Sequence, residues 1–189
     1  MQSLKFYKVN NSMVTGITSL NSMQFHFHIH GCSNVSLSHL NITAPENSPN
    51  TDGMHISSSD MIRVSSSVIG TGDDCISIGH STTNLTIHDI TCGPGHGISV
   101  GSLGKRPEEG SVNGVTVTNC TFVNTTNGAR IKTWTGTVPM EIKNITYEGI
   151  IMKDVQNPVI IDQSYGSGLP GEVSNLMQPI ALLLYNLTV

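Results

Sequence analysis

Charged residues are scarce in this sequence. Asp, Glu, Lys and Arg together make up 12% of its 189 residues, and the formal net charge is −4. A nucleic-acid-binding protein needs a basic face, which this balance does not favour. No apolar run approaches the roughly 20 residues of a membrane-spanning helix. We therefore expect a protein that binds neither nucleic acid nor a membrane.

The sequence also has few strong helix formers and no paired cysteines of the Cys-x-x-Cys type. Ala, Glu and Lys are sparse, whereas Ser, Thr, Asn, Gly, Val and Ile dominate, which favours strands joined by tight turns. The four cysteines lack the spacing typical of zinc sites, so we expect no zinc. The length suits one domain, which we predict to be all-β.

Short alternating segments recur along the chain and indicate a solenoid. They start roughly 23 to 30 residues apart, which is too short for a strand-helix-strand unit and typical of a repeat architecture. One set comprises residues 12–17, 35–42, 62–69, 85–92, 115–122 and 145–152. A second alternating strand follows in the repeats, at residues 53–57, 75–79, 97–101, 129–133 and 158–162. This pattern predicts a parallel β-helix of about six rungs.

Aligning the second set of strands brings the unusual polar residues together. Two inward apolar stacks result, one through Ile56, Ile78, Val100, Ile131 and Ile161, the other through Met54, Ile76, Ile98, Ala129 and Val159. Neighbouring strands lie about 4.8 Å apart, so residues distant in sequence become neighbours on the outer face. Three residues then precede the strands at one offset, namely Asp52, Asp74 and His96. The outward cations Arg130 and Lys132 lie on the same face.

Each of these residues also has a purely structural interpretation. Asp52 precedes a glycine and has the features of a turn residue, His96 between two glycines fits a loop, and exposed cations often serve only solubility. An isolated Asp-Asp pair such as Asp73-Asp74 also has a structural interpretation, in which one carboxylate caps a turn and the other binds backbone amides. Its neighbours here favour a functional role instead, and adjacent carboxylates repel each other and raise each other's pKa. We expect this repulsion to keep Asp73 protonated at weakly acid pH.

Six motifs in order resemble the plant polygalacturonases, which are glycoside hydrolases with a right-handed parallel β-helix. The motifs are SPNTDG (48–53), TGDDC (71–75), CGPGHG (92–97), GSLGK (101–105), NGARIKTW (127–134) and NPVIIDQSY (157–165). The resemblance implies hydrolysis of α-1,4 bonds between galacturonates in pectin, with inversion. In an inverting enzyme the acid and the base lie about 6.5–9.5 Å apart, to leave room for water. Such hydrolysis requires no metal or organic cofactor, so the resemblance implies none.

The resemblance also implies a role for each candidate residue. Asp73 is expected to be the general acid, Asp52 and Asp74 the bases that hold the water, and His96 their support. The substrate-binding residues implied are Arg130, Lys132 and Tyr165, of which the two cations would bind the sugar carboxylate. A disulfide between Cys75 and Cys92 beside the site is implied as well.

Departures from the family pattern set the expected domain limits. Family chains begin with a signal peptide and further coils, whereas this sequence opens within the repeat, and the repeat pattern is lost after Tyr165. We therefore expect a partial catalytic β-helix over residues 1–165, truncated at both ends, and a divergent segment over residues 166–189. The first residues lack the apolar core of a signal peptide.

Eight Asn-x-Ser/Thr sequons nevertheless favour an extracellular protein, although an Asn-rich sequence also produces sequons by chance. They lie at Asn10, Asn34, Asn41, Asn84, Asn119, Asn124, Asn144 and Asn186. We expect a secreted monomer of the plant cell wall that acts on pectin. Two alternatives stay open: a non-catalytic or vestigial pectin-binding β-helix fragment, and a lyase that cleaves by β-elimination, which would usually need calcium ligands and an arginine base.

Overall fold

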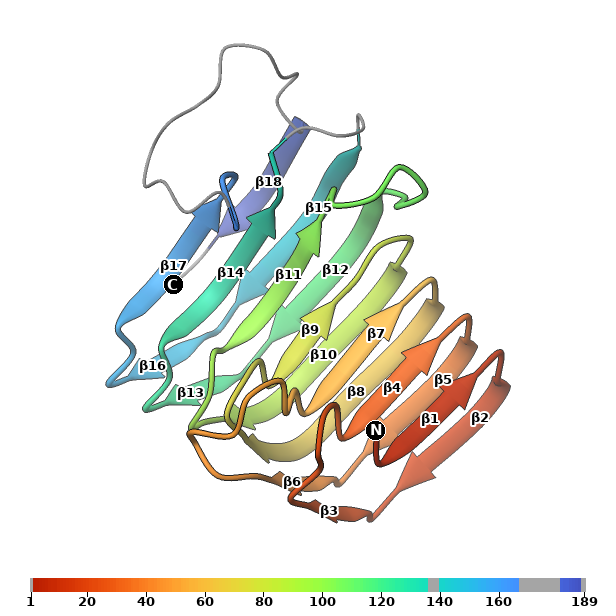
Figure 1. The fold of residues 1–189 in the computed structure, drawn as a ribbon, viewed down its shortest axis with the longest axis vertical. Coiled ribbons are helices and arrows are strands. Elements are labelled where there is room, and N and C mark those ends of the chain that lie inside the picture. The colour runs from red at the N-terminus through yellow and green to blue at the C-terminus, as the bar shows by residue number, and fades with distance from the viewer. Residues whose placement is uncertain (1, 136–139, 167–180, 188–189) are drawn as a thin grey trace.

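The computed structural model describes residues 2–135, 140–166 and 181–187, the last of these for the backbone only. This part of the chain contains strands and no helix, and hence no helix that could cross a membrane. The strands form a parallel solenoid of about six turns, as predicted (Figure 1).

One side of the solenoid is a seven-stranded sheet. Its strands, in spatial order, are β1 (Leu4–Tyr7), β4 (Phe27–His30), β7 (Met54–Ser57), β9 (Ile76–Ile78), β11 (Ile98–Leu103), β14 (Asn127–Thr133) and β17 (Asn157–Asp162). All neighbours are parallel. Because each neighbour comes from the next coil, the spatial order follows the chain order, and equivalent positions of successive coils stand side by side.

The opposite side is an eleven-stranded sheet. Its main path runs through β2 (Asn10–Thr15), β5 (Ser33–Ser38), β8 (Asp60–Gly70), β10 (Thr83–Cys92), β12 (Val112–Thr118), β15 (Glu141–Glu148) and β18 (Ala181–Leu187). Four short strands pair off this path: β3 (Thr18–Leu20), β6 (Asn41–Thr43), β13 (Thr121–Val123) and β16 (Ile151–Lys153). The predicted divergent segment 166–189 lies mostly outside the described residues, and β18 within it pairs with β15.

The core lies between the two sheets and includes the predicted apolar stacks. Ile56, Ile78 and Val100 are in register on β7, β9 and β11 and are fully buried. Val159 and Ile161 continue these stacks in register on β17, but they are 38% and 43% exposed. β17 is the last strand of its sheet in the described part of the chain, so no further described strand of this sheet covers these side chains.

Left-handed backbone positions, which recur along the solenoid, explain why the sequence is rich in asparagine. Asn34, Asn84, Asn119, Asn124 and Asn144 have φ values between 51° and 56°, in the left-handed region that asparagine tolerates better than most residues. All five belong to sequons and are exposed. Backbone conformation therefore accounts for their presence without any glycan.

Candidate active site

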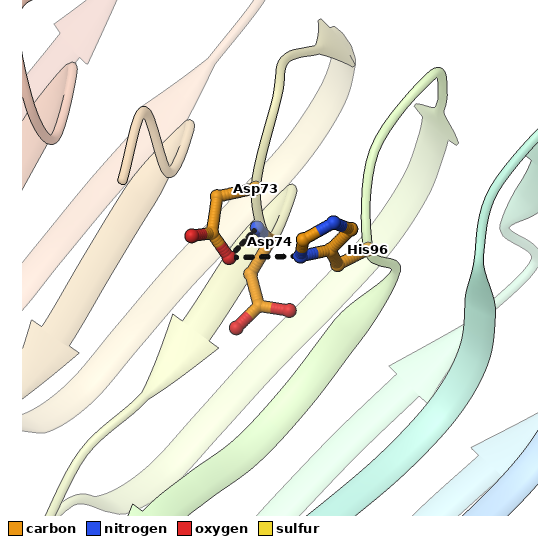
Figure 2. A group of neighbouring side chains, drawn as sticks. All are labelled: Asp73, Asp74 and His96. Atoms are coloured by element: carbon orange, nitrogen blue, oxygen red, sulfur yellow. Dashed lines mark hydrogen bonds and ion pairs between the residues drawn. The ribbon is translucent and has the colours of Figure 1, made fainter. Parts of the chain in front are cut away.

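The predicted carboxylates meet where strands β7, β9 and β11 begin. Asp52, Asp74 and His96 each lie two residues before a member of one ladder, formed by Met54, Ile76 and Ile98. Backbone bonds fix these approaches to one another: the N–H of Gly53 donates to the carbonyl of Asp74 at 2.9 Å, and the N–H of His96 donates to that of Asp73 at 2.8 Å. Figure 2 shows the side chains of Asp73, Asp74 and His96 gathered at this point.

Glycine is required at position 97, directly after His96, because the backbone of the neighbouring coil lies so close. Gly97 has a φ of +88°, and a Cβ placed on it would lie 2.2 Å from the carbonyl oxygen of Asn127. Any other residue would push the loop that carries His96 away from the neighbouring coil.

Asp74 is the buried anchor of the site. Its side chain is 1% exposed and accepts three hydrogen bonds, from the Arg130 guanidinium at 2.6 Å, the Lys132 ammonium at 2.9 Å and the Ser99 hydroxyl at 2.7 Å. The two cations come from β14, two coils beyond Asp74. A buried carboxylate needs such compensation, so these contacts keep a negative charge inside the site.

Arg130 and Lys132 therefore have a partner within the protein. Their side chains are only 13% and 8% exposed, and the Arg130 Nε also donates to the Ser99 hydroxyl at 2.9 Å. They lie on the face that the repeat predicted, and they are held close to the carboxylates.

Asp73 is the more accessible of the adjacent pair. Its side chain is 23% exposed, and its Oδ1 lies 3.1 Å from Nδ1 of His96, which is 39% exposed (Figure 2). Burial acts to raise the pKa of Asp73, but the hydrogen bonds from His96 and from the N–H of Asp74 outweigh it, and the pKa lies below its usual value. The bond to Asp73 conversely raises the pKa of His96.

Asp52, and not Asp73, is the carboxyl whose pKa is raised. Asp52 is 6% exposed, and burial, followed by the charges of Asp74 and Asp73, raises its pKa to about 7. A hydrogen bond from Ser77 and the charge of Lys132 act in the opposite direction without overcoming it. Our expectation that repulsion keeps Asp73 protonated was thus wrong: the carboxyl with the raised pKa is Asp52, which is buried and forms no ion pair with a described residue.

The remaining predicted ligand, Tyr165, lies beside Lys132. The ammonium of Lys132 is 5.3 Å from the centre of the Tyr165 ring, and Trp134 contacts this ring edge-on at 5.5 Å between centres. Lys105 in turn lies over Trp134 at 4.5 Å. Sequence reasoning did not single out Trp134 or Ser99, although Ser99 stands in the same outward column as Arg130.

A disulfide joins Cys75 and Cys92, with the Cα atoms 5.8 Å apart. Both residues are fully buried, and the bond links the start of β9, directly after Asp74, to the end of β10. Cys32 and Cys120 are buried free thiols.

Donor atoms of Asp73, Asp74 and His96 lie within 4.8 Å of one another, a spacing that would suit a metal ion. The surroundings fit a metal poorly, because both oxygens of Asp74 already bind cations and Nδ1 of His96 is bonded to Asp73. A metal ion would have to displace Arg130 and Lys132, which neutralise the carboxylate without it.

Comparison with known proteins shows which family this chain resembles. The family model of the glycosyl hydrolases family 28 matches residues 1–180. An exopolygalacturonase of Arabidopsis thaliana is 49% identical over 165 residues, and a polygalacturonase of Nicotiana tabacum is 50% identical over 163. These matches cover 87% and 86% of this chain, but only 39% and 41% of the relatives. The chain thus spans about two fifths of the length of these relatives.

Solved structures agree in fold. A polygalacturonase of Erwinia carotovora superposes with a TM-score of 0.80 at 31% identity, over 90% of this chain and 46% of the other. An endo-xylogalacturonan hydrolase of Aspergillus tubingensis superposes with a TM-score of 0.81 at 28% identity, over 86% of this chain and 46% of the other. On the match of the family model along nearly all of its length, this chain belongs to the glycosyl hydrolases family 28.

Proposed function

We propose that this chain hydrolyses α-1,4-galacturonosyl bonds of polygalacturonate, with inversion at the anomeric carbon. The observation that carries the proposal is the group of three carboxylates, one histidine and two cations that adjoining coils bring together in a family 28 solenoid. Curated relatives named as polygalacturonases support the substrate class.

Asp73 is the proposed proton donor to the leaving oxygen. It is the more exposed of the two adjacent carboxyls, and its bond to His96 gives it a neighbour that can hold a proton. The pKa of Asp73 is lowered and that of His96 is raised, so between these two values the pair holds one proton, shared across a 3.1 Å contact. His96 therefore acts as the proton reserve, and Asp73 passes the proton to the sugar oxygen.

Asp52 is the proposed base, with Asp74 as the fixed charge beside it. A water molecule held between the two loses its proton to Asp52 as it attacks the anomeric carbon. A base works best when its pKa is near the working pH, and the pKa of about 7 at Asp52 meets that condition. Arg130 and Lys132 hold the Asp74 carboxylate in place, so that it can orient this water molecule beside Asp52.

Arg130, Lys132 and Tyr165 are the proposed ligands of the substrate. A guanidinium has five N–H donors, and the bonds of Arg130 among the described residues use its Nε and one of its two NH2 groups. The other NH2 group is the one proposed to bind a galacturonate carboxylate. Tyr165 next to Lys132 offers a ring face to the sugar.

The test of this proposal is the product formed from polygalacturonate, with and without a chelator. Hydrolysis yields new reducing ends without unsaturated products and is insensitive to the chelator. Unsaturated products that disappear with the chelator would instead identify a lyase, and binding without turnover would identify a non-catalytic β-helix fragment. Asp73→Asn should abolish turnover while binding of an oligogalacturonate stays within about tenfold, because the amide keeps the shape but has no acidic proton.

The proposed site of action is the plant cell wall, where the enzyme would be secreted and act as a monomer. Exposed sequons and a buried disulfide are compatible with an oxidising compartment. Fractionation of plant tissue tests this location, and sedimentation of the purified chain tests the monomer. Recovery of the protein from the cytosol with free thiols at Cys75 and Cys92 would contradict secretion.

A further inference from the structure

A buried hydroxyl lies between the proposed base and a histidine that the mechanism above does not use. His55 on β7 and Ser77 on β9 are partners in register on neighbouring strands (Figure 1). Nδ1 of His55 lies 2.8 Å from Oγ of Ser77, and the Ser77 hydroxyl donates a hydrogen bond to the carboxylate of Asp52. Ser77 is 3% exposed. The three side chains therefore form a hydrogen-bonded chain that ends on the carboxylate.

Neighbouring side chains hold the imidazole of His55 in one orientation. The ring of Phe25 stacks on it with 4.9 Å between ring centres and an angle of 20° between planes, and the ring of His28 lies tilted at 5.5 Å. The far edge of the imidazole faces Gly79, where a Cβ would lie 3.1 Å from Nε2. Because the ring is packed in this way, its Nδ1 stays directed at Ser77.

His55 stays neutral throughout the pH range in which Asp52 titrates. Burial, followed by the charges of His28, His80, His30 and Lys132, lowers the pKa of His55 to about 3, whereas the pKa of Asp52 is about 7. A neutral imidazole carries one N–H donor and one acceptor nitrogen. The position of this single hydrogen, on Nδ1 or on Nε2, decides what the Ser77 hydroxyl can do.

A hydrogen on Nδ1 of His55 leaves the Ser77 proton free for Asp52. Nδ1 then donates to Oγ of Ser77, and the only hydrogen of that hydroxyl points to the carboxylate. With the hydrogen on Nε2, Nδ1 would instead compete with Asp52 for the Ser77 proton. A third acceptor, the carbonyl of Met54, lies 3.5 Å from Oγ, which is long for an O–H donor. Hydrogen bonds to an ionised group are stronger than neutral ones and polarise the next bond in a chain, so ionised Asp52 favours the hydrogen on Nδ1.

We propose that His55 is a positioning residue for the hydrolysis, which acts through Ser77: its Nδ1–H fixes the Ser77 hydroxyl as a donor to Asp52, and this bond holds the base ionised and in place. The inference rests on the proposed role of Asp52 as the base. It is supported by the register of β7 and β9, the 2.8 Å contact and the packing of the imidazole.

The test is an NMR titration of protein labelled with ¹³C at the Asp carboxyls and with ¹⁵N in the His rings. It compares wild type with Ser77→Ala, His55→Leu, the double variant and His55→Asn, and Asp52→Asn identifies the Asp52 signal. His55→Asn is the conservative variant, because its amide nitrogen takes the place of Nδ1 and can donate to Ser77. The matched control is His88→Leu, which removes a histidine whose Nδ1 lies 3.0 Å from the Thr118 hydroxyl on the other sheet.

In wild type the His55 hydrogen should be on Nδ1 when Asp52 is ionised. The titration midpoint of Asp52 should rise by about one pH unit in Ser77→Ala, the scale of one hydrogen bond to a charged group. It should rise by less in His55→Leu, no further in the double variant than in Ser77→Ala, and not at all in His55→Asn or His88→Leu. A hydrogen on Nε2, an unmoved midpoint in His55→Leu, or a further rise in the double variant would each overturn the inference, the last because leucine would then act by desolvation.

Turnover of trigalacturonate provides a second measurement on the same variants. The acid limb of kcat/KM should move to higher pH by the same amount as the Asp52 midpoint. A raised KM with an unmoved acid limb in His55→Leu would make His55 a ligand of the substrate and would also overturn the inference. If wild type shows no turnover, the proposed function fails, and the NMR titration still decides whether His55 acts on Asp52 through Ser77.

Discussion

Asp52→Asn should stabilise the protein at neutral pH while it removes the proposed base. Asp52 is buried, and its pKa is raised from 3.8 to about 7, so folding favours the protonated carboxyl. The stability associated with that proton is fully present below the unfolded pKa, near 3.8, and is lost as the pH rises through about 7. At pH 8 the ionised carboxylate therefore costs the fold free energy that an asparagine, which does not titrate, avoids.

The size of this effect follows from the difference between the two pKa values. At about 1.4 kcal/mol for each tenfold change in the equilibrium, a pKa raised from 3.8 to about 7 corresponds to about 4 kcal/mol. The amide changes the hydrogen bond with Ser77, so we expect a gain of about 2 to 4 kcal/mol at pH 8. At pH 4 the gain should nearly vanish. This trade of stability for a functional carboxylate is common at active sites.

Urea unfolding at pH 4 and pH 8 measures the difference, with Asp60→Asn as the control. Asp60 accepts hydrogen bonds from Thr83 and Asn84, which lower its pKa, so its replacement should instead cost stability at neutral pH. A difference between wild type and Asp52→Asn that stays constant from pH 4 to pH 8 would refute the reasoning, because Asp52 would then ionise as it does in the unfolded chain.

Three further predictions concern the same site. First, kcat/KM on polygalacturonate should fall as the pH drops below about 7, because protonated Asp52 cannot accept a proton from water. If kcat/KM instead fell as the pH rose above about 7, Asp52 would have the role of the acid. Second, Lys132→Met, which keeps a side chain of similar length, should lower kcat/KM at least about 30-fold and lower the free energy of unfolding by about 3–5 kcal/mol, because it leaves buried Asp74 with one cation fewer. Loss of activity at unchanged stability would contradict that structural role. Third, Cys92→Ser should cost about 3 kcal/mol, because the lost disulfide closes a loop with a separation of 17 residues, and the urea midpoint should then no longer respond to a reductant.

The repeat in the sequence was sufficient to predict the fold and the registers. Alternation with a period of two determines which side chains enter the core, so the stack of Ile56, Ile78 and Val100 followed directly once the rungs were aligned. The same alignment put Asp52 and Asp74 at one offset. Exposure of Val159 was not predictable in this way, because it depends on what covers the last strand rather than on the alternation itself.

Contacts between side chains were harder to predict than positions. Arg130 reaches Asp74 across 56 residues of sequence, and Lys132 reaches it across 58, which requires long side chains to lean over two coils. The sequence indicates their face but not this reach. Likewise, the raised pKa falls on Asp52 rather than Asp73 because burial and hydrogen bonds differ between the two, and neither quantity can be read from an Asp-Asp pair.

The most direct test of the account is the configuration of the first product. Proton NMR of oligogalacturonate during the first turnovers reports the anomeric form of the new reducing end before it mutarotates. Direct attack of a water molecule held by Asp52 and Asp74 on an α-linkage predicts a β-configured product. A product that is initially α-configured would contradict the inverting mechanism, and an unsaturated product would contradict hydrolysis itself.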